Sequence, residues 1–145
     1  MEELIELRSL VQRGDLQSAL TLIDELEEMS KDDKVNKIYS YAVILLLHLI
    51  KQSAEKRFTS SWEVSIHNSA TSIQRTNKRR KAGGNYLSDR ELREILDEAY
   101  DRALDNARLE AFGGAYDAIA LGKMVNRSEI LEQAMQDITP FPAKK

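Results

Sequence analysis

The chain of 145 residues contains no cysteine, only two prolines and only six glycines. The absence of cysteine excludes disulfide bonds, thiolate metal sites and a cysteine nucleophile. The scarcity of proline, glycine and β-branched runs favours helices over strands. Hydrophobic residues nevertheless make up 42% of the chain, which is enough for a folded core and argues against global disorder.

Long hydrophobic runs are also missing. The longest nearly apolar run covers the ten residues 41–50 and is interrupted by His48. A helix of that length is too short to cross a bilayer. The first residues, Met1-Glu2-Glu3, are acidic and therefore unlike a secretory signal peptide. These features predict a soluble cytoplasmic protein that does not associate with membranes.

The charges of the chain are segregated along the sequence, although the net charge is only −3. Residues 1–28 carry a net charge of −6, residues 51–81 of +6 and residues 82–138 of −6. Acidic helices packed beside a basic one are one explanation of this pattern. A basic surface for an anionic partner is the other.

Helical periodicity predicts an all-α fold, a single-domain antiparallel bundle over residues 1–145 with four main helices and short terminal helices. A turn is expected at residues 30–33, and Ser88 with Glu91 has the spacing of a capping box. The predicted main helices cover residues 16–29, 33–54, 60 to the break at 75–85, and 89 to about 111; the shorter helices cover residues 3–12, 115–121 and 129–137, the last capped by Ser128.

The predicted helix over residues 33–54 is apolar nearly all the way round at its centre. A helix of this kind is surrounded by others, so we expect it at the middle of the bundle. In the next helix, Phe58, Trp62 and Ile66 recur at helical spacing and are expected to face inward, as is Ile73.

His48 is the lone polar residue in this apolar centre. A buried imidazole needs a hydrogen-bond partner, because leaving it unpaired costs about 1–3 kcal/mol. Glu25, Glu28 and Tyr41 are candidate partners, so His48, Glu25 and Glu28 form a candidate polar core. Two interpretations remain open: a structural histidine bonded to a neighbouring helix, or a ligand or general base held by a carboxylate.

Motifs of known enzyme and cofactor sites are absent from the sequence. It contains no glycine-rich phosphate loop, no nucleophile elbow, no His-Glu-x-x-His and no Glu-x-x-His pair. The sequence therefore predicts no metal and no cofactor, and it identifies no catalytic residue.

A basic cluster follows the predicted helix that begins near Ser60, and it is a candidate surface for an anion or a partner. Cations at a helix C-terminus are also favoured by the helix dipole, so a solvated helix end explains it equally. Trp62 is a candidate aromatic anchor, although its spacing from Phe58 and Ile66 also fits core packing. The cluster comprises Arg75, Lys78, Arg79, Arg80 and Lys81.

Several segments resemble, in order and spacing, the domain-of-unknown-function family twenty-nine, an all-helical bacterial family common in cyanobacteria. They are LIDELEEM at 22–29, LLLHLIK at 45–51, SSW at 60–62, LDEAYDRA at 96–103 and, in degraded form, ITPFP at 138–142. The chain departs from the family at Gln52, where an aromatic residue is usual, and at 53–57, where a proline-containing linker is usual. The resemblance implies a helical bundle and no assigned activity.

These observations favour a non-enzymatic module for protein–protein interaction or self-association, whose partner is another protein or a second copy of the chain. Nucleic-acid association through residues 75–81 is the first alternative. A metal- or histidine-dependent hydrolase centred on His48 is the second.

Overall fold

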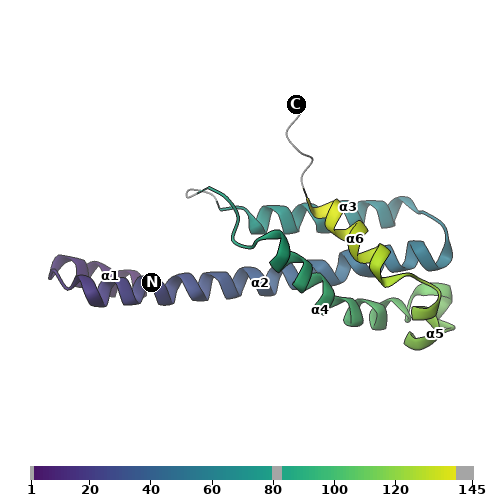
Figure 1. Ribbon diagram of the computed structural model, residues 1–145, viewed down its shortest axis with the longest axis horizontal. Helices are drawn as coiled ribbons and strands as arrows, with labels where there is room; N and C mark the ends of the chain where they lie inside the picture. The colour runs from purple at the N-terminus through teal and green to yellow at the C-terminus, as the bar shows by residue number, and fades with distance from the viewer. Residues whose placement is uncertain (1, 80–82, 140–145) are drawn as a thin grey trace, which may run out of the picture. The chain divides into compact units, whose positions relative to one another are not determined.

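The computed structural model describes residues 2–79 and 83–139, and these residues form helices with no strand (Figure 1). The all-α prediction is thus confirmed for the described part of the chain. The chain divides into two compact units, residues 1–34 and 35–145. The helices are α1 (Glu2–Gln12), α2 (Leu16–Glu55), α3 (Ser60–Asn77), α4 (Asp89–Ala107), the 3-10 helix η1 (Ala111–Gly114), α5 (Ala118–Lys123) and α6 (Arg127–Ile138).

The turn predicted at residues 30–33 is wrong, because α2 runs without a break from Leu16 to Glu55. Ser30, Asp32 and Asp33 suit caps, but they are also tolerated on the solvent side of a helix. The 40 residues of α2 contain neither glycine nor proline, so nothing in the backbone forces a stop. Two predicted helices are therefore one.

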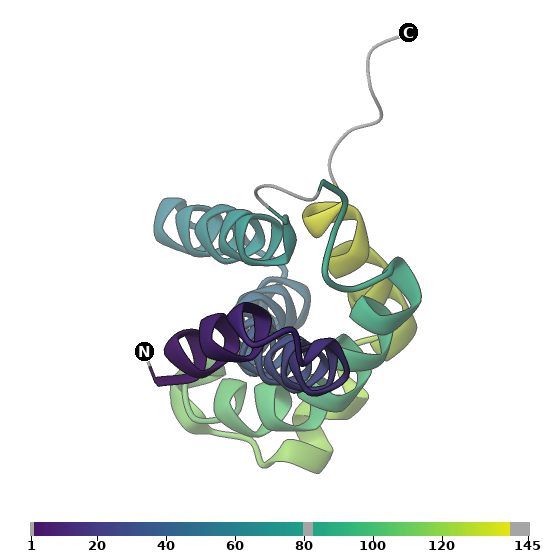
Figure 2. The same cartoon turned by 90° about the vertical axis from the view of Figure 1, so that its left-hand side faces the viewer.

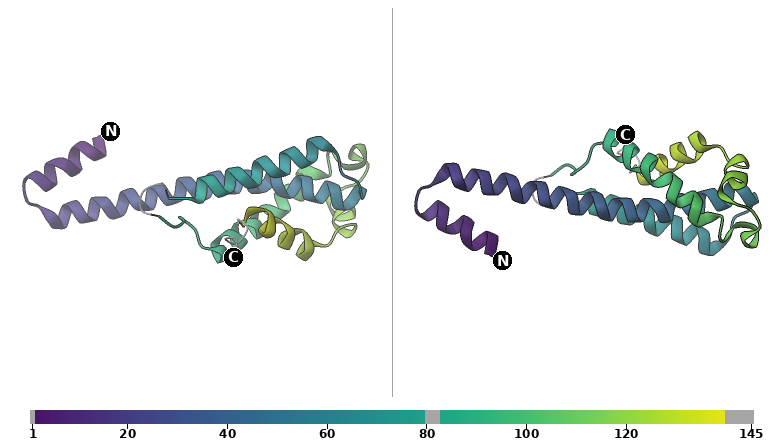
Figure 3. Two further views of the ribbon diagram at one scale, coloured as in Figure 1. Left: turned by 90° about the horizontal axis from the view of Figure 1, so that it is seen from above. Right: turned by 90° about the horizontal axis from the view of Figure 1, so that it is seen from below.

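The first unit is a helical hairpin made of α1 and the beginning of α2, whose antiparallel arrangement is plain in Figure 3. Gly14 ends α1 with a left-handed φ of +78°, and the N–H of Asp15 donates to the carbonyl oxygen of Leu10 at 2.9 Å. This is the Schellman arrangement, in which glycine avoids the steric penalty of positive φ. Asp15 then caps α2, since its Oδ1 accepts from the N–H of Ser18 at 3.2 Å.

The core of the second unit is built around the C-terminal half of α2, as predicted for the most apolar segment. This half lies between α3 on one side and α4 on the other, and α6 contacts both α3 and α4 (Figures 1 and 2). The largest side chains that are completely enclosed come from four helices: Ile38, Leu45, Leu46, Ile50, Ile73, Leu96 and Leu121.

Helix starts in the second unit depend on side-chain caps. The capping box predicted for Ser88 and Glu91 is confirmed in both of its hydrogen bonds. The prediction that Ser128 caps the last helix is wrong: the side chain of Asn126 accepts from the N–H of Glu129, and α6 begins at Arg127. The expectation for Phe58 is also wrong, because this side chain is 72% exposed. It precedes the Thr59 cap of α3 and therefore lies outside the helical stripe.

The described helices include none that is both long enough and apolar enough to cross a membrane.

Candidate functional site

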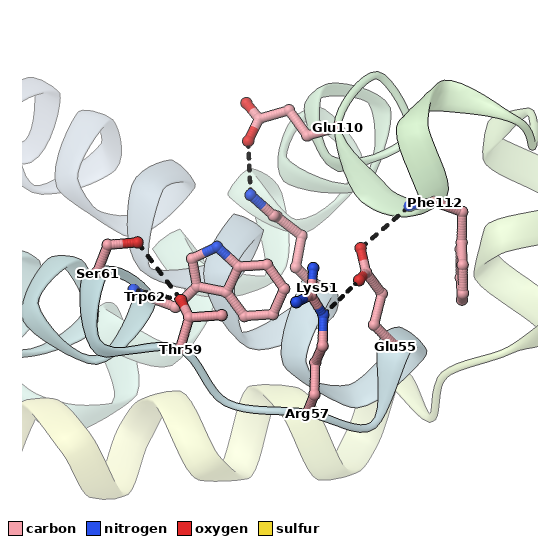
Figure 4. Close-up of polar contacts among 8 residues, drawn as sticks. All are labelled: Lys51, Glu55, Arg57, Thr59, Ser61, Trp62, Glu110 and Phe112. Carbon is pink, nitrogen blue, oxygen red and sulfur yellow. Dashed lines mark hydrogen bonds and ion pairs between the residues drawn. The ribbon is translucent and has the colours of Figure 1, made fainter.

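The end of α2, the start of η1 and the start of α3 meet around one buried cation, Lys51 (Figure 4). Its Nζ lies 2.7 Å from Oε1 of Glu110 and 4.7 Å from the ring centroid of Trp62. Lys51 is only 7% exposed, and a buried ammonium needs both a counter-charge and further stabilisation. The carboxylate of Glu110 supplies the first and the indole face the second.

A second cation reaches the same indole. The guanidinium of Arg57 lies 4.9 Å from the ring centroid of Trp62, and its Nε donates to Oε1 of Glu55 at 2.8 Å. The backbone N–H of Trp62 donates to the hydroxyl of Thr59 at 3.1 Å, which begins α3 and holds the indole in place (Figure 4). Trp62 is therefore a buried residue with polar neighbours, at 8% exposure.

The carboxylate of Glu55 joins the end of α2 to η1. Its Oε2 accepts from the backbone N–H of Phe112 at 3.0 Å. This hydrogen bond lowers the pKa of the Glu55 carboxyl, with a smaller contribution from Arg57 in the same direction. Phe112 has a φ of +53°, which is costly for a bulky residue. The bond from Glu55 helps to hold that conformation.

His48 lies one turn before Lys51 on α2 and is partly buried. The prediction that it is hydrogen-bonded within the bundle is wrong for Nδ1, which is buried and has no partner among the described residues. Burial lowers the pKa of His48, and the Lys51 charge lowers it further, whereas Glu110 opposes the shift. The imidazole is therefore neutral at neutral pH.

The other members of the predicted polar core do not accompany His48. Glu25 and Glu28 are exposed and precede it by 23 and 20 residues along the same helix, so the structure does not bring them to the imidazole. Tyr41, the other candidate partner, is partly buried. A general base needs its second nitrogen oriented by an acceptor, and Nδ1 has none. Within the described residues, no group of three or more histidine and acidic side chains is placed to hold a metal.

We call Lys51, Glu55, Arg57, Trp62 and Glu110 the indole clamp. Each of its charged groups already has a partner of opposite charge within the cluster. The arrangement therefore links three elements and leaves no cation or carboxylate of the clamp unpaired for chemistry.

The basic cluster is described only in part, since Arg80 and Lys81 lie outside the described residues. Arg75, Lys78 and Arg79 are exposed. The backbone N–H of Arg79 donates to the carbonyl of Gly84 at 3.0 Å, and its guanidinium lies 5.7 Å from the ring centroid of Tyr86. The described part of the cluster thus covers the last turn of α3, which contains Arg75, and the two residues that follow the helix, Lys78 and Arg79.

Among the described residues, seven of the fifteen large apolar side chains that are exposed lie in the N-terminal hairpin. Of the described hairpin residues, only Leu10 and Ala19 are buried, at 7% and 3% exposure. Leu7, Leu22 and Leu26 are partly buried, and the other large apolar side chains described in the hairpin are open to solvent. We call the following set the hairpin face: Leu4, Ile5, Val11, Leu16, Leu20, Ile23 and Met29, which are 37% to 70% exposed.

Sequence reasoning found His48 and Trp62 but missed the residues that surround them. The sequence could have indicated that Lys51 is buried, because Lys51 follows His48 by three residues and so falls on the same side of the helix. No local pattern could have indicated Glu110 as its partner, since the two residues are 59 positions apart in the sequence.

The comparisons with known proteins bear on these segments. A family model described as "Domain of unknown function DUF29" matches residues 9–134, whereas comparisons with curated proteins and with solved structures find no match. The matched range contains His48, Lys51, Trp62 and Glu110, and it confirms the resemblance drawn from the sequence. The chain therefore belongs to the family described as domain of unknown function DUF29.

Proposed function

We propose that the protein is a non-enzymatic protein–protein interaction module and that the hairpin face is its docking surface. The observation that carries the proposal is that seven apolar residues in the described part of the hairpin are exposed, whereas two are buried and three are partly buried. A concentration of exposed apolar side chains in one segment, here residues 4–29, marks interaction sites in soluble proteins, because covering them releases water. Scattered single apolar residues would carry no such meaning.

The charge of the hairpin identifies the chemistry of the partner. Residues 1–34 contain ten acidic and four basic side chains. A surface that is both apolar and acidic is complementary to a basic amphipathic helix, which supplies leucine-like side chains for the apolar residues and ammonium groups for the carboxylates. A second copy would bring the same negative charge to the same surface. We therefore propose a basic amphipathic helix of another protein as the partner.

The indole clamp supports the non-enzymatic interpretation. Its cations and carboxylates are paired with one another, and His48 is neutral without an acceptor at Nδ1. No observation favours the hydrolase alternative. Nucleic-acid association through the basic cluster stays a prediction.

The proposal is tested with two synthetic amphipathic peptides on the full chain. One has a leucine stripe bordered by lysine, and the other has the same stripe bordered by glutamate. We expect the Leu/Lys peptide to bind with a dissociation constant in the micromolar range and the Leu/Glu peptide to bind at least about tenfold more weakly. Isothermal titration calorimetry measures both. Equal affinity for the two peptides would contradict the charge argument.

Variants then locate the binding surface. Leu20→Gln and Ile5→Gln each replace an exposed apolar side chain of the hairpin face and should weaken the Leu/Lys peptide about tenfold. Ile119→Gln is the matched control, because Ile119 is 73% exposed but lies in α5. If all three variants bind as the unaltered chain does, the docking surface is elsewhere. Concentration-dependent sedimentation that is lost in Leu20→Gln would instead identify a second copy as the occupant.

A further inference from the structure

A pocket of about 600 Å³ opens among the end of α2, α3 and α6. Its apolar lining consists of Leu49, Ile66, Ala70 and Ile130, together with Phe58. The volume lies within the range of small-molecule sites, which is about 300–1,000 Å³. Phe58, the aromatic residue that we expected in the core, is 72% exposed and lines this pocket.

The charged groups of the pocket have one sign. Among the residues that the structure describes, its lining includes three carboxylates, Glu63 of α3 with Glu129 and Asp137 of α6, and no lysine or arginine. His67 of α3 is the remaining titratable group of the lining. Single-sign charge around a low-dielectric surface concentrates the field and attracts the opposite charge. The pocket is therefore suited to a cation and unsuited to an anion.

Two basic residues near the pocket in the sequence are already engaged elsewhere. Arg57 precedes Phe58 directly, but its guanidinium is held by Glu55 at 2.8 Å and lies over Trp62. Lys51 precedes Gln52 of the pocket lining, but it is paired with Glu110 at 2.7 Å. The indole clamp thus holds both cations in its own contacts, and neither contributes to the pocket lining.

The carboxylate of Asp137 in the pocket is partly shielded from water. Its Oδ1 accepts from Nε2 of Gln133 at 3.0 Å. Burial nevertheless raises the pKa of the Asp137 carboxyl, and the bond from Gln133 opposes this shift. Burial removes water molecules that would stabilise the charged carboxylate of Asp137. A cation bound beside it would provide that stabilisation instead.

From the apolar lining, the exposed aromatic ring and the three carboxylates together, we infer that this pocket binds a small organic ammonium ion with an apolar body. The apolar body occupies the surface of Leu49, Ile66 and Ile130. The ammonium group faces the carboxylates, and the ring of Phe58 offers a cation–π contact. This site shares no residue with the hairpin face.

Three probes with nearly the same apolar body and different charge test the inference. They are 2-phenylethylammonium, 2-phenylethanol and 3-phenylpropanoate, titrated into the full chain while the methyl resonances of Ile66 and Ile130 are followed by NMR. We expect the ammonium ion to shift these resonances with an affinity at least about tenfold above that of the alcohol. The carboxylate should produce no saturable shift. Binding of the alcohol as tight as that of the ammonium ion, or no binding of any probe, would overturn the inference.

Two kinds of variant complete the test. Glu129→Gln removes one carboxylate of the pocket and should weaken the ammonium ion several-fold, whereas Glu98→Gln removes an exposed carboxylate on α4 and should change nothing. Equal effects of the two variants would mean that only overall charge matters, which contradicts a built site. Ser53→Trp places a large side chain at an exposed position of the lining and should abolish binding. Undiminished binding in this variant would locate the ligand elsewhere.

Discussion

Lys51 shows how one buried side chain can connect several helices. Its ammonium group is buried against Trp62 and paired with Glu110, so it links α2, α3 and η1 at once. The exposed fraction of the Glu110 side chain is 52%, which places the pair between a surface and a buried ion pair. Its net contribution to stability is therefore modest, although removing one partner alone leaves a buried charge unpaired.

A double-mutant cycle measures that contribution. Lys51→Met, Glu110→Gln and the double variant should give a coupling free energy of about 1 kcal/mol in chemical unfolding. The same cycle on Arg90 and Glu94, a pair with side chains 88% and 62% exposed, is the control and should give about 0.5 kcal/mol or less. A coupling no larger than that of the control would show that Lys51 is held by packing alone.

His48 makes stability depend on pH in a direction that follows from its lowered pKa. Burial keeps the imidazole neutral in the folded state, with Lys51 adding to the effect and Glu110 opposing it. Below the unfolded-state pKa of about 6.5, the unfolded chain takes up a proton that the folded chain resists, so stability falls as pH falls. At higher pH this contribution is complete.

The test compares the free energy of unfolding at about pH 7.5 and about pH 5.5 in the unaltered chain and in His48→Gln. The unaltered chain should lose more stability than the variant between the two values. The opposite order would mean that the folded protein binds the proton more tightly than the unfolded chain, which would contradict the lowered pKa of His48.

At the scale of helices, α2 shows most clearly what a sequence pattern can establish. Leu46 is completely buried, as expected for the centre of the bundle, whereas Leu20 on the same helix is 57% exposed. Both positions continue an apolar periodicity, so the pattern alone makes them look alike. Only the presence of packing neighbours distinguishes them.

The same substitution at both positions should therefore have different effects. Leu46→Ala should lower the free energy of unfolding by about 2–5 kcal/mol, because it opens a cavity where helices meet. Leu20→Ala should change it by about 0.5 kcal/mol or less. Equilibrium denaturation measures both. Similar losses at the two positions would mean that the hairpin face is already covered within the chain.

Prediction from sequence succeeded where the evidence was local and repeated. The stripe Leu92, Ile95, Leu96 and Ala99 of α4 is buried throughout, and the capping box that begins this helix is present. It failed at residues 30–33, where capping residues proved compatible with a continuing helix. The indole clamp could not be predicted, because Glu110 and Lys51 meet only through tertiary packing.

At the scale of the whole chain, the segregation of charge separates the remaining hypotheses. The basic cluster offers at most five cations, Arg75, Lys78, Arg79, Arg80 and Lys81, against a net charge of −3 for the chain. Retention on double-stranded DNA should be weak and should fall with a log–log salt slope no steeper than about −4.5. Changing Arg75, Lys78 and Arg79 to alanine should reduce that slope without weakening the Leu/Lys peptide. Tight retention at physiological salt would favour nucleic-acid binding as the function.

The central claim is that the hairpin face docks a basic amphipathic helix. Hydrogen–deuterium exchange of the full chain, with and without the Leu/Lys peptide, tests it most directly because it reports where the peptide binds. We predict that amides within residues 2–34 exchange more slowly in the complex, while those of α4 are unchanged. Slower exchange confined to α3 and α6, or no change in residues 2–34, would contradict the claim.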